Sequence, residues 1–310
     1  MRVDVAVVDG VLATGVSSVV DVFSTAESVR GARRSHAPPI TVTCVGSGQS
    51  VVASNGMTIP CTAGWDGLSS ADVVVVPGFG IEREHEVAPF LRRPDVLELV
   101  DALGALGSSE VNIAAACAGS FLAAEAGLLE HRRATTTWWL SRLFRVRYPR
   151  VDLAIDEMVV RDGPVLTAGA AFGHVDLALA IVASISAELA TTVGRYLAVD
   201  QRTRQGDFIE LAHLTAGDSL VAAFDRLVVQ SLARSPGVND LAGELGTTRR
   251  TLERRVQAAT GLTPLGLIRR RRAGRARDLL AETEWSTSRV AAEVGYRNAS
   301  TLRRLLRVHG

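Results

Sequence analysis

A chain of 310 residues is long enough to bury the cores of two domains, and its formal net charge at pH 7 is only +1. Its three cysteines, Cys44, Cys61 and Cys117, lie far apart without metal-ligand spacing, which argues against a disulfide framework and a zinc site. No apolar run is as long as a membrane span, and the first residues are typical of a buried strand rather than a signal peptide. We therefore expect a cytoplasmic protein with no membrane segment.

The small net charge conceals two halves of opposite sign. Residues 1–225 carry 17 arginines against 26 aspartates and glutamates, a net charge of −9, whereas residues 226–310 carry 17 arginines against 7 acids, a net charge of +10. An acidic segment joined to a basic one is the electrostatic pattern of nucleic-acid binding confined to one domain. We therefore look for DNA contacts in the C-terminal part of the chain.

The first part of the chain alternates strand and helix patterns. Continuous β-branched or apolar runs predict buried strands, and apolar residues at helical spacing predict helices. The expected strands are residues 3–8, 40–45, 51–53, 72–77, 111–116, 134–137, 158–161 and 165–167, and the expected helices are residues 17–30, 95–106, 121–126 and 174–197. This order predicts an α/β fold with a mostly parallel sheet covered on both faces.

Residues 112–129 (NIAAACAGSFLAAEAGLL) are the chemically suggestive segment of this domain. A buried strand meets a helix through a turn of small residues, which places Cys117 at the carboxyl edge of the sheet. Backbone N–H groups and the helix dipole are expected to lower the pKa of a thiol there and to hold an oxyanion. A small buried thiol without a function is the alternative interpretation of Cys117.

With PGFG at residues 77–80 and RRATTTWW at residues 132–139, this segment resembles the PfpI/ThiJ branch of the class I glutamine amidotransferase-like fold, over roughly residues 1–190. The resemblance implies a flavodoxin-like, mostly parallel sheet sandwich. In catalytic relatives it also implies a histidine directly after the cysteine or in the later T-x-W segment, and a glutamate of the early helix that touches the thiol.

This sequence departs from the catalytic pattern at each of those places. Ala118 follows the cysteine, Trp138 stands in the later segment, and the early helix offers Val19 and Val20 with only Asp21 as an acid. His131 and His174 are the remaining candidate bases, and nothing in the sequence brings either one to Cys117. A cysteine hydrolase needs a base within hydrogen-bond reach. We therefore predict no catalytic residue, no metal, no cofactor and no enzymatic activity.

A ligand site at the carboxyl edge is still expected without catalysis, because this edge is where α/β sheets bind small molecules. A small anionic or amide-bearing metabolite is the expected ligand. The residues expected to line the site are Gly78, Phe79, Cys117, Ala118, Trp138 and Gly169. The alternative for Trp138 and Trp139 is that they only pack the helix that follows.

Residues 238–310 contain the same short pattern twice: an apolar helix, a glycine turn, and a helix that begins with small polar residues and carries arginines. The first copy is residues 240–245, Gly246 and residues 248–259; the second is residues 287–294, Gly295 and residues 299–308. Small polar and cationic residues at the start of the second helix are typical of a helix-turn-helix. One copy alone would favour a solvated amphipathic helix, but two copies joined by a long helix make that interpretation weak.

The second helix of each copy is called a reading helix below. Apolar stripes face inward, and the opposite faces carry the residues expected to contact DNA: Arg249, Arg250, Glu253, Arg254, Ser300, Arg303 and Arg304. Arg272, on the connecting helix of residues 264–282, is expected to meet a phosphate. That helix of nineteen residues spans roughly 28 Å, close to one turn of B-DNA, about 34–36 Å.

Residues 238–309 resemble the DNA-binding domain of the AraC/XylS family of bacterial transcription regulators. The resemblance rests on RTLERR, ATGLTP and VAAEVGY with the serine that follows. Residues 198–237, which contain RQGDFI, are expected to link this domain to the first, at residues 1–197. End to end, the chain resembles the GlxA-type subfamily, which joins an amidase-like domain to an all-α double helix-turn-helix domain.

The resemblance predicts a ligand-responsive transcription regulator whose first domain senses a metabolite and forms a homodimer. The expected partners are double-stranded DNA, a small-molecule effector, a second copy of the chain and RNA polymerase. Two alternatives stay open: a constitutive DNA-binding regulator with an inert dimerisation domain, and a cysteine-dependent amidase or glyoxalase-like enzyme.

Overall fold

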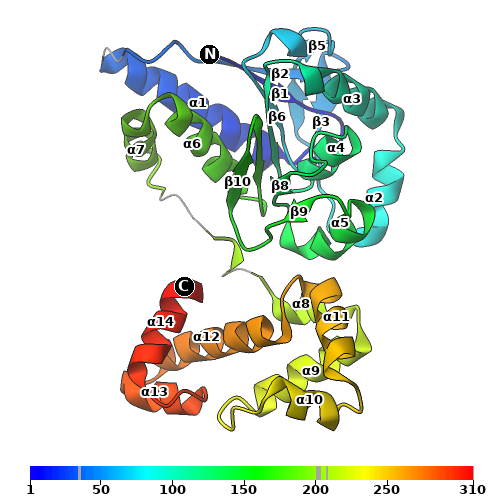
Figure 1. Ribbon diagram of the computed structural model, residues 1–310. Coiled ribbons are helices and arrows are strands. Elements are labelled where there is room, and N and C mark those ends of the chain that lie inside the picture. The colour runs from blue at the N-terminus through cyan, green and yellow to red at the C-terminus, as the bar shows by residue number, and fades with distance from the viewer. Residues whose placement is uncertain (34–35, 200–203, 207–208, 310) are drawn as a thin grey trace. The chain divides into compact units, whose positions relative to one another are not determined.

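The computed structural model describes residues 1–33, 36–199, 204–206 and 209–309. The chain divides into two compact units, Met1–Gly206 and Asp207–Gly310 (Figure 1). The first is an α/β unit, and the described residues of the second form helices joined by turns. The fold class expected from the sequence is confirmed. Residues 198–237, expected as a linker, contribute to both units.

A seven-stranded sheet forms the centre of the first unit, in the order β10-β11-β7-β6-β1-β2-β5. Its neighbouring pairs are parallel except for β10 and β11, which are antiparallel. The strands are β1 (Arg2–Ala6), β2 (Thr41–Gly46), β5 (Thr62–Ala63), β6 (Val73–Val76), β7 (Asn112–Ala116), β10 (Val159–Asp162) and β11 (Val165–Ala168). Because β1, β6, β7 and β11 run in one direction, their carboxyl ends meet at one edge.

Helices cover both faces of this sheet. On one face α1 (Ala13–Ala32), α6 (Gly173–Ile185) and α7 (Ala187–Tyr196) pack against one another. On the other face lie α3 (Pro94–Ala105) and α4 (Gly119–Glu125) (Figure 1). The unit is completed by two shorter helices: α2 (Glu84–Leu91), which the sequence pattern did not predict, and α5 (Ser141–Arg147), which is the helix expected after Trp138 and Trp139.

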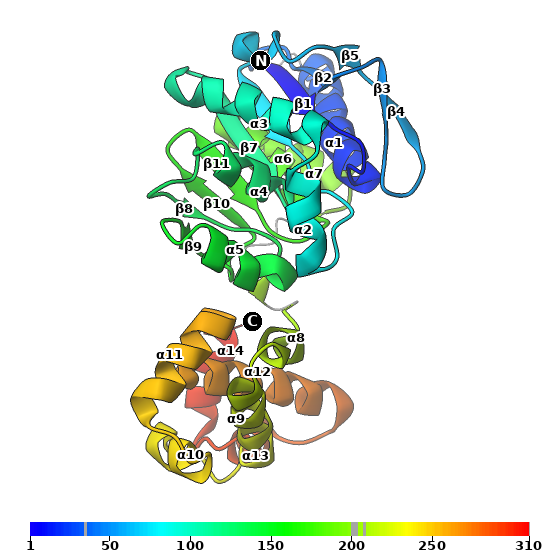
Figure 2. The same ribbon diagram turned by 90° about the vertical axis from the view of Figure 1, so that its right-hand side faces the viewer.

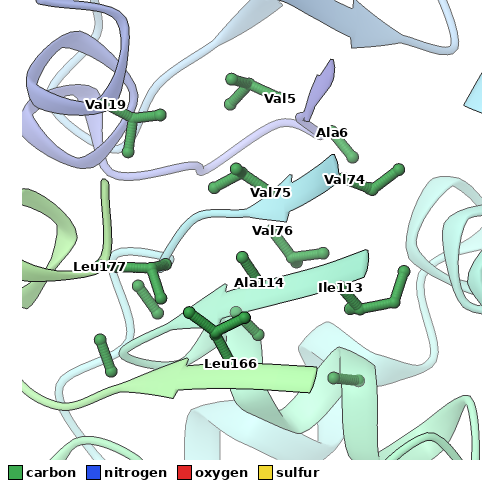
Figure 3. Packing of buried hydrophobic residues seen from close by; sticks show 14 of the residues in the cluster. Val5, Ala6, Val19, Val74, Val75, Val76, Ile113, Ala114, Leu166 and Leu177 are labelled. Atoms are coloured by element: carbon green, nitrogen blue, oxygen red, sulfur yellow. The ribbon is translucent and has the colours of Figure 1, made fainter. Parts of the chain in front are cut away.

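Strand side chains alternate between the two faces. Val5 and Val75 point toward the same side as Leu177 of α6, whereas Val74 and Ile113 point the opposite way (Figure 3). All five are almost fully buried. Burial on both faces explains why these strands are continuous apolar runs rather than alternating ones.

Two expected strands differ from the structure. Residues 51–53 do not join the main sheet: β3 (Ser50–Val52) pairs antiparallel with β4 (Thr58–Pro60) as a separate hairpin (Figure 2). The expected strand at residues 134–137 is wrong beyond its first residue, because β8 is only Arg133–Ala134, paired with β9 (Asp152–Leu153). The backbone N–H of Thr135 donates to the Thr167 side chain and does not continue a ladder.

The helix expected over residues 174–197 is two helices. Ser186 separates α6 from α7 with an extended backbone, φ −158°, and its Oγ accepts from the backbone N–H of Leu189 at 3.2 Å. Serine competes with helix continuation because its side chain satisfies a free N–H at a helix start.

The second unit holds two apolar cores joined by α12 (Pro264–Glu282), whose bounds match the expected connecting helix. The first core is formed by α9 (Ser219–Gln230), α10 (Val238–Glu244), α11 (Arg249–Thr260) and the start of α12, with α8 (Leu211–Ala216) beside α9 and α11. The second is formed by the remainder of α12, α13 (Thr287–Glu293) and α14 (Ala299–His309). Both helix-turn-helices predicted from the sequence are present.

Candidate functional site

The carboxyl edge of the sheet holds a strained turn at Cys117. The residue lies between β7 and α4 with φ 53°, a backbone conformation that is unfavourable for any residue other than glycine. Its N–H donates to the carbonyl of Ala168 at 2.8 Å. A Cβ on Gly119 would lie 2.4 Å from the carbonyl oxygens of Val76 and Pro77, so only glycine fits there. The sharp turn expected from the sequence is present.

His174 lies beside this turn, contrary to the expectation that nothing brings it to Cys117. Cys117 Sγ is 3.2 Å, and His174 Cε1 3.3 Å, from the point that a Cβ on Gly78 would occupy. The N–H of Gly78 donates to His174 Nε2 at 2.8 Å. Nε2 is therefore the unprotonated nitrogen, and Nδ1 donates to the Ala171 carbonyl.

Neither side chain of this pair is charged near neutral pH. Burial lowers the pKa of His174 to about 4, although its hydrogen bond to Ala171 opposes the shift. Burial raises the pKa of the Cys117 thiol to about 11, against smaller opposing contributions from Ala118 and Thr137. The expectation that the turn lowers the thiol pKa is wrong, because desolvation outweighs the nearby N–H groups.

The residue of α1 that faces the imidazole is Gly15. A Cβ at this position would lie 2.6 Å from His174 Nε2. Val19 is fully buried in the core and Asp21 is exposed, so neither takes the place of the glutamate that the resemblance implied. His174 fills the space against Gly15, and its only unprotonated nitrogen is occupied by Gly78.

The predicted ligand residues are partly brought together. Gly78, Cys117 and Ala118 are buried side by side at the turn, whereas Phe79 packs on Phe90 with ring centroids 4.6 Å apart. Trp138 is half-buried and meets Trp139 edge to face.

The sixth residue, Gly169, is covered by the side chain of Gln205. Sequence reasoning missed Gln205 because it assigned that segment to the linker. The only sequence signal was the RQGDFI motif, which does not indicate whether the glutamine is buried or exposed.

A hollow of about 620 Å³ lies away from this edge, along α6 and α7. It is lined mostly by small side chains and was not predicted: Leu179, Ala183, Ala187, Ala190, Thr191, Gly194, Arg195, Ala198 and Val199. Neither Cys117 nor His174 lines this hollow; both lie at the carboxyl edge of the sheet.

The reading helices α11 and α14 carry exposed arginines. Arg250 and Arg254 are exposed and have no ion pair among the residues that the structure describes, whereas Arg249 pairs with Glu253 at 2.7 Å. On α14, Arg303 and Arg304 are likewise exposed and unpaired within the described ranges. Ser300 hydrogen-bonds to Asn298, whose side chain also accepts from the N–H of Thr301.

Two ion pairs attach α9 to the helices beside it. Asp218 caps α9 by accepting from Leu220 and Val221 and also receives Arg255 of α11, at 2.6 Å and 2.7 Å. Asp225 of α9 pairs with Arg271 of α12, and its side chain is only 8% exposed. The first pair holds α11 at the start of α9, the second holds α12 against α9, and neither was predicted.

Arg272 is buried, so the expectation that it meets a phosphate is wrong. Its Nη2 donates to Ser235 Oγ at 2.7 Å, and its guanidinium lies 5.1 Å from the ring centroid of Tyr296. It belongs to the inner stripe of α12, four residues from both Ile268 and Ala276. It joins the loop before α10 to the second helix-turn-helix.

An α/β unit with a mostly parallel sheet, followed by two helix-turn-helices on one connecting helix, is the architecture of a DNA-binding transcription regulator. The chain belongs to the DJ-1/PfpI family, whose model matches residues 1–184. Residues 241–309 match the model of a helix-turn-helix domain, which is of the AraC type. The family resemblances inferred from the sequence are confirmed.

Individual relatives agree with this assignment. The chain is 28% identical to the HTH-type transcriptional regulator CdhR of Pseudomonas aeruginosa, over 94% of this chain and 85% of that protein. It is 28% identical to an isonitrile hydratase of Pseudomonas putida over 42% of this chain and 53% of the enzyme. Its fold resembles a crystal structure of an AraC family transcriptional regulator from Pseudomonas putida, with a TM-score of 0.53 at 20% identity, covering 63% of this chain and 98% of that one.

The described residues contain neither a membrane-spanning helix nor a cluster of metal-binding side chains. None of their helices is long and apolar enough to span a membrane. None of their histidine, cysteine, aspartate and glutamate side chains form a group of three or more that could hold a metal ion.

Proposed function

We propose that this regulator responds to a small metabolite, that its α/β unit senses the metabolite without catalysis, and that its reading helices contact base edges. The observation that carries the proposal is a contrast between two groups of side chains. The Cys117–His174 pair is buried and neutral, whereas several exposed arginines of α11 and α14 have no ion pair among the residues that the structure describes. Arginine recognises guanine edges and phosphates through its planar fork. Arg250, Arg254, Arg303 and Arg304 are the proposed contacts.

Absence of catalysis is supported by the protonation state of the turn. A nucleophilic cysteine acts as its thiolate, and a pKa of about 11 leaves the thiol protonated at neutral pH. The neighbouring imidazole offers no free nitrogen to remove the proton, since Nε2 accepts from Gly78. The strained backbone of Cys117 and the similarity to an isonitrile hydratase favour an enzyme, and both are equally compatible with an inherited fold.

We further propose a homodimer formed through the acidic α/β unit. The nineteen-residue α12 already lets one chain reach adjacent grooves, so the helical unit does not itself require a partner. Tethering two such units would raise affinity through effective concentration. Such a regulator would act on cytoplasmic DNA, and contact with RNA polymerase would follow if it activates transcription.

Three measurements test this proposal on the full chain. A thermal-shift screen against small amides, amino acids, amines and carboxylates should give stabilisation by one class, whereas no response to any class would favour the constitutive alternative. Hydrolysis of an amide or glyoxal substrate that vanishes in Cys117→Ser would contradict the absence of catalysis. Light scattering at micromolar concentration should give a dimer, and a monomer would contradict the assembly.

A further inference from the structure

Gln205 inserts a carboxamide into the carboxyl edge of the sheet. The residue is fully buried, and its Nε2 donates to Thr135 Oγ1 and to the Thr136 carbonyl, both at 2.9 Å. It lies 70 residues beyond Thr135 in the chain and one residue before the end of the first unit. A long-range polar contact of this kind ties the end of the unit to its interior.

The carboxamide lies flat on Gly169. A Cβ on this glycine would be 2.2 Å from each of Cδ, Nε2 and Oε1 of Gln205, so the amide plane rests on the glycine Cα. No side chain at residue 169 can coexist with this arrangement, because Cβ contacts below 3.0 Å are not tolerated. The glycine thus forms the floor of a site shaped for a planar amide.

The backbone beside Gln205 is held at the same place. Arg204 forms an isolated antiparallel bridge with Glu157, and the N–H of Gly206 donates to the Asp156 carbonyl at 3.2 Å. Residues 204–206 are therefore held within the first unit by the Gln205 side chain and by backbone contacts on either side of it. The second unit begins at Asp207.

A continuous hydrogen-bond network joins this site to the Cys117 turn. The Thr136 hydroxyl donates to the Cys117 carbonyl at 3.2 Å, and Ser120 Oγ donates to the same carbonyl at 2.8 Å. Thr136 thus meets the turn through its side chain and Gln205 through its backbone carbonyl. The Gln205 carboxamide and the Cys117 turn therefore belong to one hydrogen-bond network at the carboxyl edge.

The chemistry of the site selects against a negative charge. Its floor and walls offer acceptors, the Thr136 carbonyl and the Thr135 hydroxyl oxygen, which suit an N–H donor and repel a carboxylate. Oε1 of Gln205 accepts no hydrogen bond from any part of the chain that the structure describes. A buried acceptor without a donor weakens the hold of Gln205, since such groups are costly.

We propose that the Gln205 carboxamide occupies the effector site as an internal ligand, and that the effector is a neutral molecule with a primary carboxamide that displaces it. Displacement undocks residues 204–206 and so changes the attachment of the DNA-binding unit. This inference rests on the proposed sensing function and narrows the metabolite class from anionic or amide-bearing to amide-bearing. A ligand shifts such an equilibrium only by its differential affinity for the open state.

Chemical rescue tests the site directly in the full chain. Gln205→Ala should leave a carboxamide-sized space, so acetamide at about 0.1 M, a concentration suited to a ligand with so few heavy atoms, should raise its thermal midpoint. Acetate should not, because it has no N–H for Thr136. The double variant Gln205→Ala, Gly169→Ala is the matched control, and its added methyl group should abolish the rescue. Equal shifts with acetate and acetamide, or rescue that persists in the double variant, would overturn the proposal.

Hydrogen exchange tests the undocking. Exchange at Gly206 should be about tenfold faster in Gln205→Ala than in wild type, because two hydrogen bonds are lost. Gln205→Glu, which keeps the shape and removes the N–H donors, should behave alike. Acetamide added to the wild-type chain should also speed this exchange, which keeps the test valid if the variants unfold. Unchanged exchange in wild type with acetamide would contradict displacement.

DNA binding by the wild-type chain separates the two proposals. If wild type binds DNA but acetamide neither rescues Gln205→Ala nor affects exchange, the internal-ligand inference fails and the regulator remains. If rescue succeeds but neither acetamide nor Gln205→Ala alters DNA affinity, the site exists and the sensing function fails.

Discussion

The two units differ in how they hold the titratable side chains of their candidate sites. At the carboxyl edge of the α/β unit, Cys117 and His174 are buried and held neutral, with pKa values of about 11 and about 4. On the helical unit, Arg250 and Arg254 of α11 are exposed. A site that excludes charge suits a small neutral ligand, whereas a surface that displays it suits a polyanion. The difference shows how one chain can divide sensing from DNA binding.

The helical unit also contains the same contrast within itself. The arginines of α11 at positions 250 and 254 face solvent, but Arg271 and Arg272 of α12 turn inward to Asp225 and Ser235. Arginine content alone therefore does not mark a DNA contact. Exposure and the absence of a carboxylate partner are the deciding properties.

The largest expected effect comes from removing the carboxylate partner of an inward-facing arginine. Asp225→Ala should lower the free energy of unfolding of the helical unit by about 3 kcal/mol, because it leaves Arg271 partly buried without its partner. Denaturant unfolding measures the change. Asp278→Ala, at an exposed position of α12, is the matched control and should change stability by less than about 0.5 kcal/mol. Equal effects of the two would contradict a structural role for Asp225.

Next in size is the loss of an outward arginine. Arg254→Ala should weaken binding to a specific duplex by about 1–3 kcal/mol, because a bidentate base contact is lost. Binding to random duplex DNA should change less. Arg226→Ala, an exposed arginine of α9, controls for the loss of one charge. If Arg254→Ala lowers specific and random affinity equally, the assigned reading face is wrong.

A third prediction uses the pH dependence of stability to test whether His174 is neutral in the folded protein. The folded-state pKa of His174 lies below its unfolded value of 6.5, so the unfolded chain binds the proton more readily between pH 6.5 and about 4. The free energy of unfolding of the α/β unit should therefore fall by about 1.5 kcal/mol as pH drops from 6.5 to 5. His174→Gln should remove this slope. If His174→Gln has the same pH dependence of stability as wild type, a group other than His174 is titrating.

The smallest effect is expected at the cysteine. Cys117→Ser should leave DNA affinity within about 0.5 kcal/mol of wild type, because the thiol is buried in the sensing unit and performs no turnover. Its influence should be confined to the ligand response. Loss of DNA binding in a folded Cys117→Ser protein would contradict this separation.

Local patterns predicted the helical unit well. Proline at residue 264 and the apolar stripe gave α12 with its observed bounds, and Thr248 caps α11 as its sequence position indicated. These features are encoded within a few residues of where they act. The alternation of strands and helices likewise gave the α/β class, although the pairing of the β3–β4 hairpin depends on neighbours outside the pattern.

The sites were harder to predict because they are assembled from distant residues. Gly78 and His174 are 96 residues apart, Gln205 and Thr135 are 70 apart, and Asp218 and Arg255 are 37 apart. No periodicity relates such pairs. The thiol pKa was mispredicted for a similar reason, since burial by the whole fold outweighs the local turn.

Selection of bound sequences from a random duplex pool by the full chain tests the central claim most directly. The account predicts enrichment of two short blocks whose centres lie about 10 base pairs apart in each half-site, because α12 spaces the reading helices by nearly one turn. The double variant Arg250→Ala, Arg254→Ala should lose the block read by α11 and keep the other. A pool with no enriched sequence, or the same two blocks enriched by the double variant, would contradict the account.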